Sequence, residues 1–289
     1  MEEAIKKADA LIEALPYIQR FHEKIVVIKF GGSAMQDPDV FDGILEDVAF
    51  LATVGARPVV VHGGGARISE GMSRRGLEPT FVRGHRVTDA ESLEVACEVL
   101  GKTSEEIVSK IKSFGAGAES LFHDGDTPVQ ARKKRLLVEG EEKDLGYVGE
   151  VAAVDTEAFL EVTCRGVVPV VPPLGRDETG QLYNINADTA AAAIAVSLRA
   201  EKLVFLSNVH GIMSDPADPG SLLTTVDESQ AEKLIEKEVI SGGMLPKVRA
   251  SLETLQKGVH KAHIIDGRLP HSLLLEIFTR RGVGTQIVE

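Results

Sequence analysis

The sequence predicts an α/β protein: a three-layer αβα sandwich around a central, mainly parallel open sheet, preceded by a kinked N-terminal helix. Short runs rich in β-branched residues, such as 25–30 and 58–61, alternate with longer segments of helical periodicity. Such alternation is typical of parallel βαβ units. The chain has 289 residues, 43% of them apolar, which is enough for one large domain or two smaller lobes.

Residues 1–24 precede the first strand and are predicted to form a separate helical arm. Its apolar residues recur every three to four positions and form one stripe: Ile5, Ala8, Ile12, Leu15, Tyr17 and Phe21. Pro16 either kinks this helix or begins a second turn of helix. The stripe either packs on the arm's own domain or reaches a neighbouring subunit.

The rest of the chain divides into two predicted lobes, 25–178 and 179–289, with the polar segment 175–180 at their boundary. The stretch 115–147 is rich in Gly, Asp, Lys and Glu. It is therefore expected to form hairpins or loops that do not belong to the alternating strands and helices. The first lobe should contain strands at 25–30, 58–61 and 167–171 and helices ending near Val54, Arg75 and Lys112. The second should contain helices at 188–198, 229–237 and 247–256 and strands at 203–206 and 262–265.

Composition excludes several classes of protein. The formal net charge is −12, and this field opposes a polyanion, so nucleic acid is not an expected partner. The longest apolar stretches, 25–28 and 190–196, fall short of the roughly 18 residues that span a bilayer. The N-terminus lacks the apolar core of a secretory signal, so we expect a cytoplasmic protein. His260 and His263 could share a face, but no acidic residue completes a metal set, and we expect no protein-held metal.

Two glycine turns indicate a phosphate site. Lys29 ends the first predicted strand, and Gly31 and Gly32 follow it; Gly63, Gly64 and Gly65 follow the second strand. Parallel strands place both turns at one sheet edge, where backbone amides can approach an anion closely. The lysine precedes the glycines, which fits neither the P-loop nor the dinucleotide fingerprint. Taken singly, each glycine pair could be only a tight turn.

Further along the chain, two helix starts carry polar residues with open interpretations. Asn186 precedes Asp188 at the start of an alanine-rich helix, where it could be a plain N-cap. Lys247 begins a later helix, where the helix dipole and its own charge both attract phosphate. Alone, it could equally be a solvated lysine.

Together these segments resemble the N-acetylglutamate kinases of the amino acid kinase family. The similarity runs in order over nearly the whole chain. The segments that carry it are Lys29 to Gly32, Gly63 to Gly65, Gly84-His85-Arg86-Val87-Thr88-Asp89, Asn184-Ile185-Asn186-Ala187-Asp188 and Gly242-Gly243-Met244-Leu245-Pro246-Lys247.

The resemblance implies ATP-dependent phosphorylation of the γ-carboxylate of N-acetyl-L-glutamate, the second step of arginine biosynthesis. By it, Lys29 and Lys247 hold the β- and γ-phosphates and Asp188 orients both lysines. The glycine turns donate amides to the transferring phosphoryl, Gly64, Arg86 and Asn184 hold the substrate, and Mg²⁺ completes the neutralisation of charge. A carboxylate, with a reference pKa of about 4.3, is already ionised and needs no general base.

A second resemblance concerns regulation. His271 and the run 275–285 are similar to the arginine-binding signature of the inhibited, hexameric branch. This implies an L-arginine site, for which the candidate residues are Tyr17, Lys202, His271, Glu276 and Gly282. It also implies a trimer of dimers joined by interlaced N-terminal helices, with substrate binding and dimerisation in 25–178 and ATP and arginine binding in 179–289. Gly282 and Gly284 could instead simply turn the chain into a last strand. Binding of a PII-type signalling protein is left open.

The chain departs from the family at several positions, among them Ala66 where a proline is common, and other functions compete. Asn208-Val209-His210-Gly211 stands where the family has Asp-Val-Asp-Gly near the nucleotide, and the loop 118–126 is longer than usual. The alternatives are another enzyme of the superfamily, acting on UMP, aspartate, glutamate or carbamate, or a non-catalytic arginine sensor.

Overall fold

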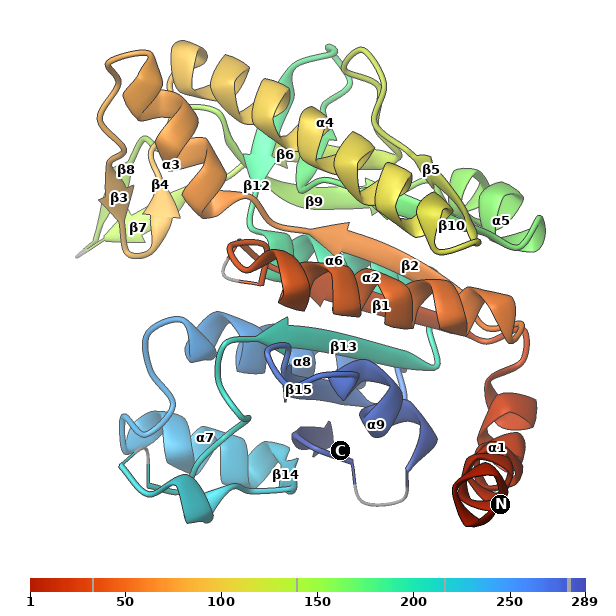
Figure 1. The fold of residues 1–289 in the computed structure, drawn as a ribbon. Helices are drawn as coiled ribbons and strands as arrows, with labels where there is room; N and C mark the ends of the chain where they lie inside the picture. Colours follow the sequence, from red (N-terminus) through yellow and green to blue (C-terminus); the bar gives the residue numbers. More distant parts are fainter. Residues whose placement is uncertain (33, 139, 216, 280–281) are drawn as a thin grey trace.

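A central eight-stranded sheet organises the computed structural model, which describes residues 1–32, 34–138, 140–215, 217–279 and 282–289. The strand order is β14-β16-β15-β13-β1-β2-β10-β5. Neighbouring strands run parallel except β15 and β16, which pair antiparallel. Helices cover both faces (Figure 1), so the predicted fold class is confirmed.

The main-sheet strands are β1 (Ile25–Phe30), β2 (Arg57–His62), β5 (Gly117–Ser120), β10 (Val167–Val171), β13 (Lys202–Ser207), β14 (Thr225–Asp227), β15 (Ala262–Asp266) and β16 (Thr285–Val288). The helices are α1 (Glu2–Phe21), α2 (Pro38–Thr53), α3 (Gly65–Arg74), α4 (Ala90–Ser113), α5 (Thr156–Cys164), α6 (Ala187–Ser197), α7 (Glu228–Glu236), α8 (Met244–Gln256) and α9 (Ser272–Phe278), with a 3-10 turn at Pro219–Ser221.

The buried strands divide their side chains between two cores. In β1, Val26, Ile28 and Phe30 belong to a core formed with α2, α4 and α9, whereas Val27 belongs to the opposite core, formed with α5, α6 and α8. This follows from the two-residue period of a strand. Lys29 has the parity of Val27, so its side chain emerges on the face of α6 and α8, where it meets Asp188 of α6.

Smaller β-structures accompany the main sheet. A closed barrel joins β6 (Val129–Lys133), β9 (Val148–Val154), β11 (Leu174–Arg176) and β12 (Leu182–Ile185). Two hairpins pair β3 (Phe81–Val82) with β4 (His85–Arg86), and β7 (Leu136–Val138) with β8 (Glu141–Lys143).

The expectation of hairpins and loops over 115–147 was only partly right. It holds for the hairpin β7–β8 and the strand β6, but it is wrong for Gly117–Ser120, which forms the parallel edge strand β5 beside β10. The segment 175–180 comprises the last two residues of β11 and most of the turn that leads to the antiparallel strand β12. The main sheet runs through both predicted lobes, and their boundaries stay a prediction.

The N-terminal arm is one helix, α1, which runs unbroken through Pro16. Phe21 at its end is only 2% exposed, but Ile5, Leu11, Ile12 and Leu15 are 45–68% exposed. In Figure 1 this helix stands at the edge of the molecule, beside α9 and away from the layers. Most of its apolar stripe therefore does not pack on its own chain. No helix in the described ranges is long and apolar enough to cross a bilayer.

Candidate functional site

Three charged residues from three elements, two of them buried and one half-buried, meet at the carboxyl edge of the sheet. Lys29 Nζ of β1 lies 2.6 Å from Asp188 Oδ1 of α6. Lys247 Nζ of α8 donates a hydrogen bond of 2.8 Å to Asp188 Oδ2. The side chains of Lys29 and Asp188 are 8% and 7% exposed and that of Lys247 is 15% exposed. We call these three residues the lysine–aspartate cluster.

Local sequence explains why Asp188 faces both lysines. Asn186 is the N-cap of α6, and its side-chain oxygen accepts hydrogen bonds from the backbone N–H groups of Asp188 and Thr189. This confirms the N-cap interpretation of Asn186 and places Asp188 in the first turn, where the helix dipole stabilises a carboxylate. The alanines that follow are buried and let α6 pack closely on β1 and α8.

The cluster carries one excess positive charge on side chains that are largely withdrawn from solvent. Burial alone would raise the pKa of the Asp188 carboxyl, but the charges of Lys29 and Lys247 outweigh burial and lower it. The pKa of Lys29 is lowered, first by burial and also by the charge of Lys247, although Asp188 opposes the shift. Two cations against one anion leave the cluster short of negative charge. A buried excess charge is costly, so an anionic ligand is favoured here.

The two glycine turns lie side by side next to this cluster. A Cβ on Gly63 would lie 3.3 Å from Gly31 Cα, and a Cβ on Gly31 would lie 3.5 Å from Lys29 Nζ. A Cβ on Gly64 would lie only 2.6 Å from Leu100 Cδ2 of α4. Both turns line one cavity of about 230 Å³, together with Lys29 and Asp188. The predicted convergence of the two turns on one site is therefore present.

Arg86 and Asn184 line the other end of the same cavity. The guanidinium of Arg86 donates to Gly65 O at 2.9 Å and Ser69 Oγ at 2.8 Å, makes a weak contact with Met72 Sδ, and lies 4.7 Å from the Phe81 ring centre. Three of its five N–H donors are thus engaged, and two are left over for a ligand. Burial lowers the pKa of Arg86, a group that stays charged at any ordinary pH.

Several residues of the site were not singled out from the sequence. Thr88 is fully buried, and its hydroxyl lies 3.4 Å from Asn184 Nδ2. Ser69 and Phe81 position Arg86. Only the fold brings these groups together, because they come from separate elements. In the altered loop, His210 Nδ1 lies 3.0 Å from Asp266 Oδ2, so an acid from β15 is present beside it.

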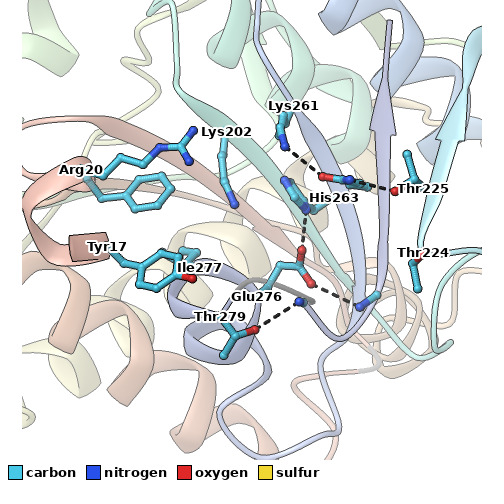
Figure 2. Close-up of a pocket in the computed structure, with 14 residues that line it drawn as sticks. Tyr17, Arg20, Lys202, Thr224, Thr225, Lys261, His263, Glu276, Ile277 and Thr279 are labelled. Carbon is cyan, nitrogen blue, oxygen red and sulfur yellow. Dashed lines mark hydrogen bonds and ion pairs between the residues drawn. The ribbon is translucent and has the colours of Figure 1, made fainter. Parts of the chain in front are cut away.

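A second cavity, of about 450 Å³, lies between α1 and the C-terminal part of the chain (Figure 2). Tyr17 and Arg20 project into it from α1, facing Lys202, His263 and Glu276. Lys202 Nζ lies 5.2 Å from the centre of the Phe21 ring, and burial lowers the pKa of Lys202 to about 8. We call this cavity the α1–α9 pocket.

Glu276 is the anchored anion of the α1–α9 pocket. Its Oε1 accepts from His263 Nδ1 at 2.6 Å, and its Oε2 accepts from the backbone N–H groups of Val283 and Gly284 at 2.8 and 3.2 Å. Burial would raise the pKa of Glu276, but these contacts and Lys202 lower it. A Cβ on Gly282, whose φ is +63°, would lie 2.7 Å from Glu276 Oε1. Gly282 thus leaves room for this carboxylate.

Four of the five candidate arginine-binding residues meet in this pocket: Tyr17, Lys202, Glu276 and Gly282. His271 does not line it. His271 Nδ1 lies 2.7 Å from Asp47 Oδ1 of α2, beside a different cavity. Arg280 and Arg281, also part of the signature run, lie outside the described residues. β16 follows Gly284 directly, so the turn into a last strand is present as well.

The sequence is similar to those of known proteins over nearly its whole length. Residues 24–266 match the model of the amino acid kinase family. The acetylglutamate kinase of Symbiobacterium thermophilum is 48% identical, over 100% of this chain and 99% of the relative. The acetylglutamate kinase of Methanothrix thermoacetophila is 46% identical, over 98% of this chain and 99% of the relative.

Solved structures agree with the sequence comparison. An N-acetylglutamate synthase from Neisseria gonorrhoeae, complexed with coenzyme A and N-acetyl-glutamate, matches 98% of this chain with a TM-score of 0.85 and 29% identity. This chain spans 63% of the length of that synthase. A carbamate kinase from Giardia lamblia, at 16% identity and a TM-score of 0.64, shares the fold. The chain therefore belongs to the amino acid kinase family and, within it, to the acetylglutamate kinases.

Proposed function

We propose that this protein transfers the γ-phosphoryl group of ATP to the γ-carboxylate of N-acetyl-L-glutamate, giving N-acetyl-L-glutamyl 5-phosphate and ADP. The observation that carries this proposal is the lysine–aspartate cluster with one excess positive charge, whose Lys29 and Asp188 line one cavity with the two glycine turns. Phosphoryl transfer depends chiefly on positioning and on cations that meet charge on the equatorial oxygens.

The proposed step moves no proton. An oxygen of the acceptor carboxylate forms a bond to the γ-phosphorus, while the bond from that phosphorus to the β–γ bridging oxygen breaks and its electrons go to ADP. Lys29 and Lys247 stabilise the charge on the phosphates, and the amides of the glycine turns donate to the transferring group. Asp188 holds both lysines in place at 2.6 and 2.8 Å. Its lowered pKa, set by both lysines against burial, suits a fixed anion rather than a base.

The residues present fit Mg²⁺ bound through the nucleotide rather than through the protein. No group of three or more His, Cys, Asp or Glu side chains with metal-site geometry occurs in the described part of the chain. The ion would neutralise charge on the β- and γ-phosphates when ATP is bound. The chain's own contribution is the pair of lysines beside them.

The acceptor end of the cavity is suited to a dicarboxylate with a blocked amine. Arg86 has two N–H donors left for a carboxylate, and its guanidinium is fixed by Gly65, Ser69 and Phe81. A guanidinium held in this way offers a charge-assisted hydrogen bond to a carboxylate. Asn184, on β12, supplies an amide that can bind the acyl group.

An acceptor panel tests the assignment. ADP release with MgATP would be measured with N-acetylglutamate, glutamate, aspartate, carbamate and UMP, and the acyl phosphate would be trapped with hydroxylamine. We expect turnover with N-acetylglutamate and a trapped hydroxamate. Equal or faster turnover of glutamate or UMP would overturn the acceptor, and no turnover with any acceptor would favour a non-catalytic sensor.

The α1–α9 pocket supports a second part of the proposal, feedback inhibition by L-arginine. Glu276 provides an anchored anion for the guanidinium, and Lys202 and Lys261 provide cations for the carboxylate. A synthase of Neisseria gonorrhoeae, complexed with coenzyme A and L-arginine, matches the chain at a TM-score of 0.81. Arginine should raise the N-acetylglutamate concentration needed for half-maximal rate, and an unchanged saturation curve at saturating arginine would contradict this.

The proposal also covers the oligomeric state and the separate roles of the two lobes. The exposed apolar stripe of α1 is suited to interlace with that of a neighbouring subunit, which would build a hexamer from three dimers. The lobe 25–178 contributes Arg86 and the glycine turns, and the lobe 179–289 contributes Asp188, Lys247 and most of the α1–α9 pocket. ATP as phosphoryl donor suits a cytoplasmic location.

A further inference from the structure

His62 is a buried titratable residue for which the proposed reaction has no role. It ends β2, directly before the glycine turn, and is 0% exposed. Val60, two residues earlier, belongs to the core formed with α4. By strand parity the imidazole therefore points toward α4, away from the face on which Lys29 emerges.

Both ring nitrogens of His62 have partners. Nε2 lies 2.7 Å from Ser104 Oγ of α4, and Nδ1 lies 3.2 Å from the carbonyl oxygen of Gly63. A carbonyl oxygen can only accept, so Nδ1 carries the proton and donates to Gly63. Nε2 then accepts from the hydroxyl of Ser104. The opposite tautomer would set a ring lone pair against the Gly63 carbonyl.

The ring is held neutral by its surroundings. Burial, opposed by the Gly63 carbonyl and assisted by the charge of Arg67, lowers the pKa of His62 to about 4. A protonated ring would carry a hydrogen on Nε2 as well, and Ser104 could then no longer donate to it. One defined tautomer is therefore present at neutral pH.

The contact with Gly63 fixes the peptide unit that joins Gly63 to Gly64. In a trans peptide the C=O and the N–H point in opposite directions. With the Gly63 oxygen turned toward the imidazole, the Gly64 N–H points away from it, toward the cavity that Gly64 lines. This N–H makes no hydrogen bond to another described residue. Gly64 is also the N-cap of α3, so its N–H lies outside the helical hydrogen-bond ladder.

Helix α4 fixes this arrangement at two points one turn apart. Leu100 is the residue that a Cβ on Gly64 would strike, and Ser104 contacts His62. Residues four apart on a helix share one face, so a single rigid element holds both the turn and the imidazole behind it.

We propose that His62 is a positioning residue: as the neutral, Nδ1-protonated tautomer, it holds the Gly63 carbonyl so that the Gly64 N–H is aimed at the transferring phosphoryl group. This rests on the proposed phosphoryl transfer. A preorganised donor of this kind stabilises charge that develops in the transition state, so its loss lowers kcat more than it raises KM.

Two replacements of His62 separate the two ring nitrogens. His62→Asn keeps an N–H donor near the place of Nδ1, whereas His62→Gln keeps a group near Nε2 for Ser104 and loses the donor to Gly63. We expect His62→Gln to lower kcat by roughly 10- to 100-fold with both KM values within about threefold, and His62→Asn to retain most of kcat. Equal losses in both variants would reduce His62 to a packing residue and overturn the proposal.

A tautomer measurement requires neither activity nor a variant that folds well. Protein labelled with ¹⁵N-histidine should give a fully buried imidazole whose Nδ1 is protonated and whose Nε2 is not, at pH 7. An Nε2-protonated signal for His62 would overturn the proposal even in an active enzyme. Failure of the acceptor panel with the wild-type protein would instead point to the proposed function, since the tautomer does not depend on the substrate.

Discussion

Lys29, at the end of the first strand of the sheet, forms a buried ion pair of 2.6 Å with Asp188, at the start of a helix that follows much later in the chain. The same carboxylate binds Lys247 at 2.8 Å through its other oxygen. One acid therefore sets the separation of two cations. The effect of changing any of the three on the proposed reaction can be predicted from this geometry.

Removing the charge of Asp188 should impair catalysis more than substrate binding. In Asp188→Asn, the two lysine ammonium groups repel each other without a counter-charge, so we expect kcat to fall on the order of 10²-fold or more. The matched control is Asp155→Asn, which changes another helix N-cap region outside the cavity. Steady-state kinetics in N-acetylglutamate and ATP provide the measurement, and a variant with unchanged kcat would contradict the role of the cluster.

The stability of the fold should depend on pH through His62. Its pKa is about 4 in the folded protein, against 6.5 as its ordinary value. Between these pH values the unfolded chain binds a proton that the folded chain does not, so this contribution is complete above pH 6.5 and is lost as the pH falls toward 4. The slope is at most about 1.4 kcal/mol per pH unit for one proton.

The variant His62→Gln isolates that contribution from the other titrating groups. The free energies of unfolding of both proteins would be measured by denaturant titration at pH 7 and pH 5. We expect the wild-type protein to lose more free energy than the variant over this interval. An equal loss in both proteins would show that the imidazole is accessible to protons in the folded state.

Gly282→Ala should abolish inhibition by arginine while leaving catalysis intact. The new methyl group would lie 2.7 Å from Glu276 Oε1, and the residue has a left-handed φ of +63°. Gly258→Ala is the control, since its φ is +93° but a Cβ there meets nothing within 4 Å. Isothermal titration with arginine and the uninhibited kcat are the two readouts. Wild-type affinity in Gly282→Ala would argue against Glu276 as the guanidinium partner.

Charged residues on the arm should dissociate the proposed hexamer. Leu11 and Leu15 are four residues apart on α1 and are 66% and 45% exposed. Leu11→Lys combined with Leu15→Lys places like charges in the interlaced interface, so light scattering should give the mass of a dimer. Glu13→Gln on the same helix should leave the mass unchanged. A double variant that remains hexameric would assign assembly to another surface.

Local sequence pattern was sufficient to predict most helices and strands of this fold. The features that it did not predict depend on contacts between residues that are distant in sequence. Lys29 and the glycines that follow the first two strands predicted that both turns meet at one sheet edge, and they line one cavity there. By contrast, Gly117–Ser120 has no strand propensity of its own and is a strand because β10 pairs with it. The partner of His271 is Asp47, 224 positions away, and nothing near either residue indicates the pair. The partner of His62 likewise depends on where α4 crosses β2.

The α1–α9 pocket brings together the two ends of the chain, whereas the glycine turns and the lysine–aspartate cluster occupy the middle of the sheet. Under the proposed inhibition by arginine, the rate of the enzyme and its sensitivity to arginine are therefore set by different parts of the chain. If arginine binds there as proposed, substitutions in the α1–α9 pocket should change the arginine concentration that inhibits the enzyme and leave kcat unchanged. Strains selected to escape the proposed inhibition should accordingly carry their changes among the residues that line this pocket, and not at the glycine turns.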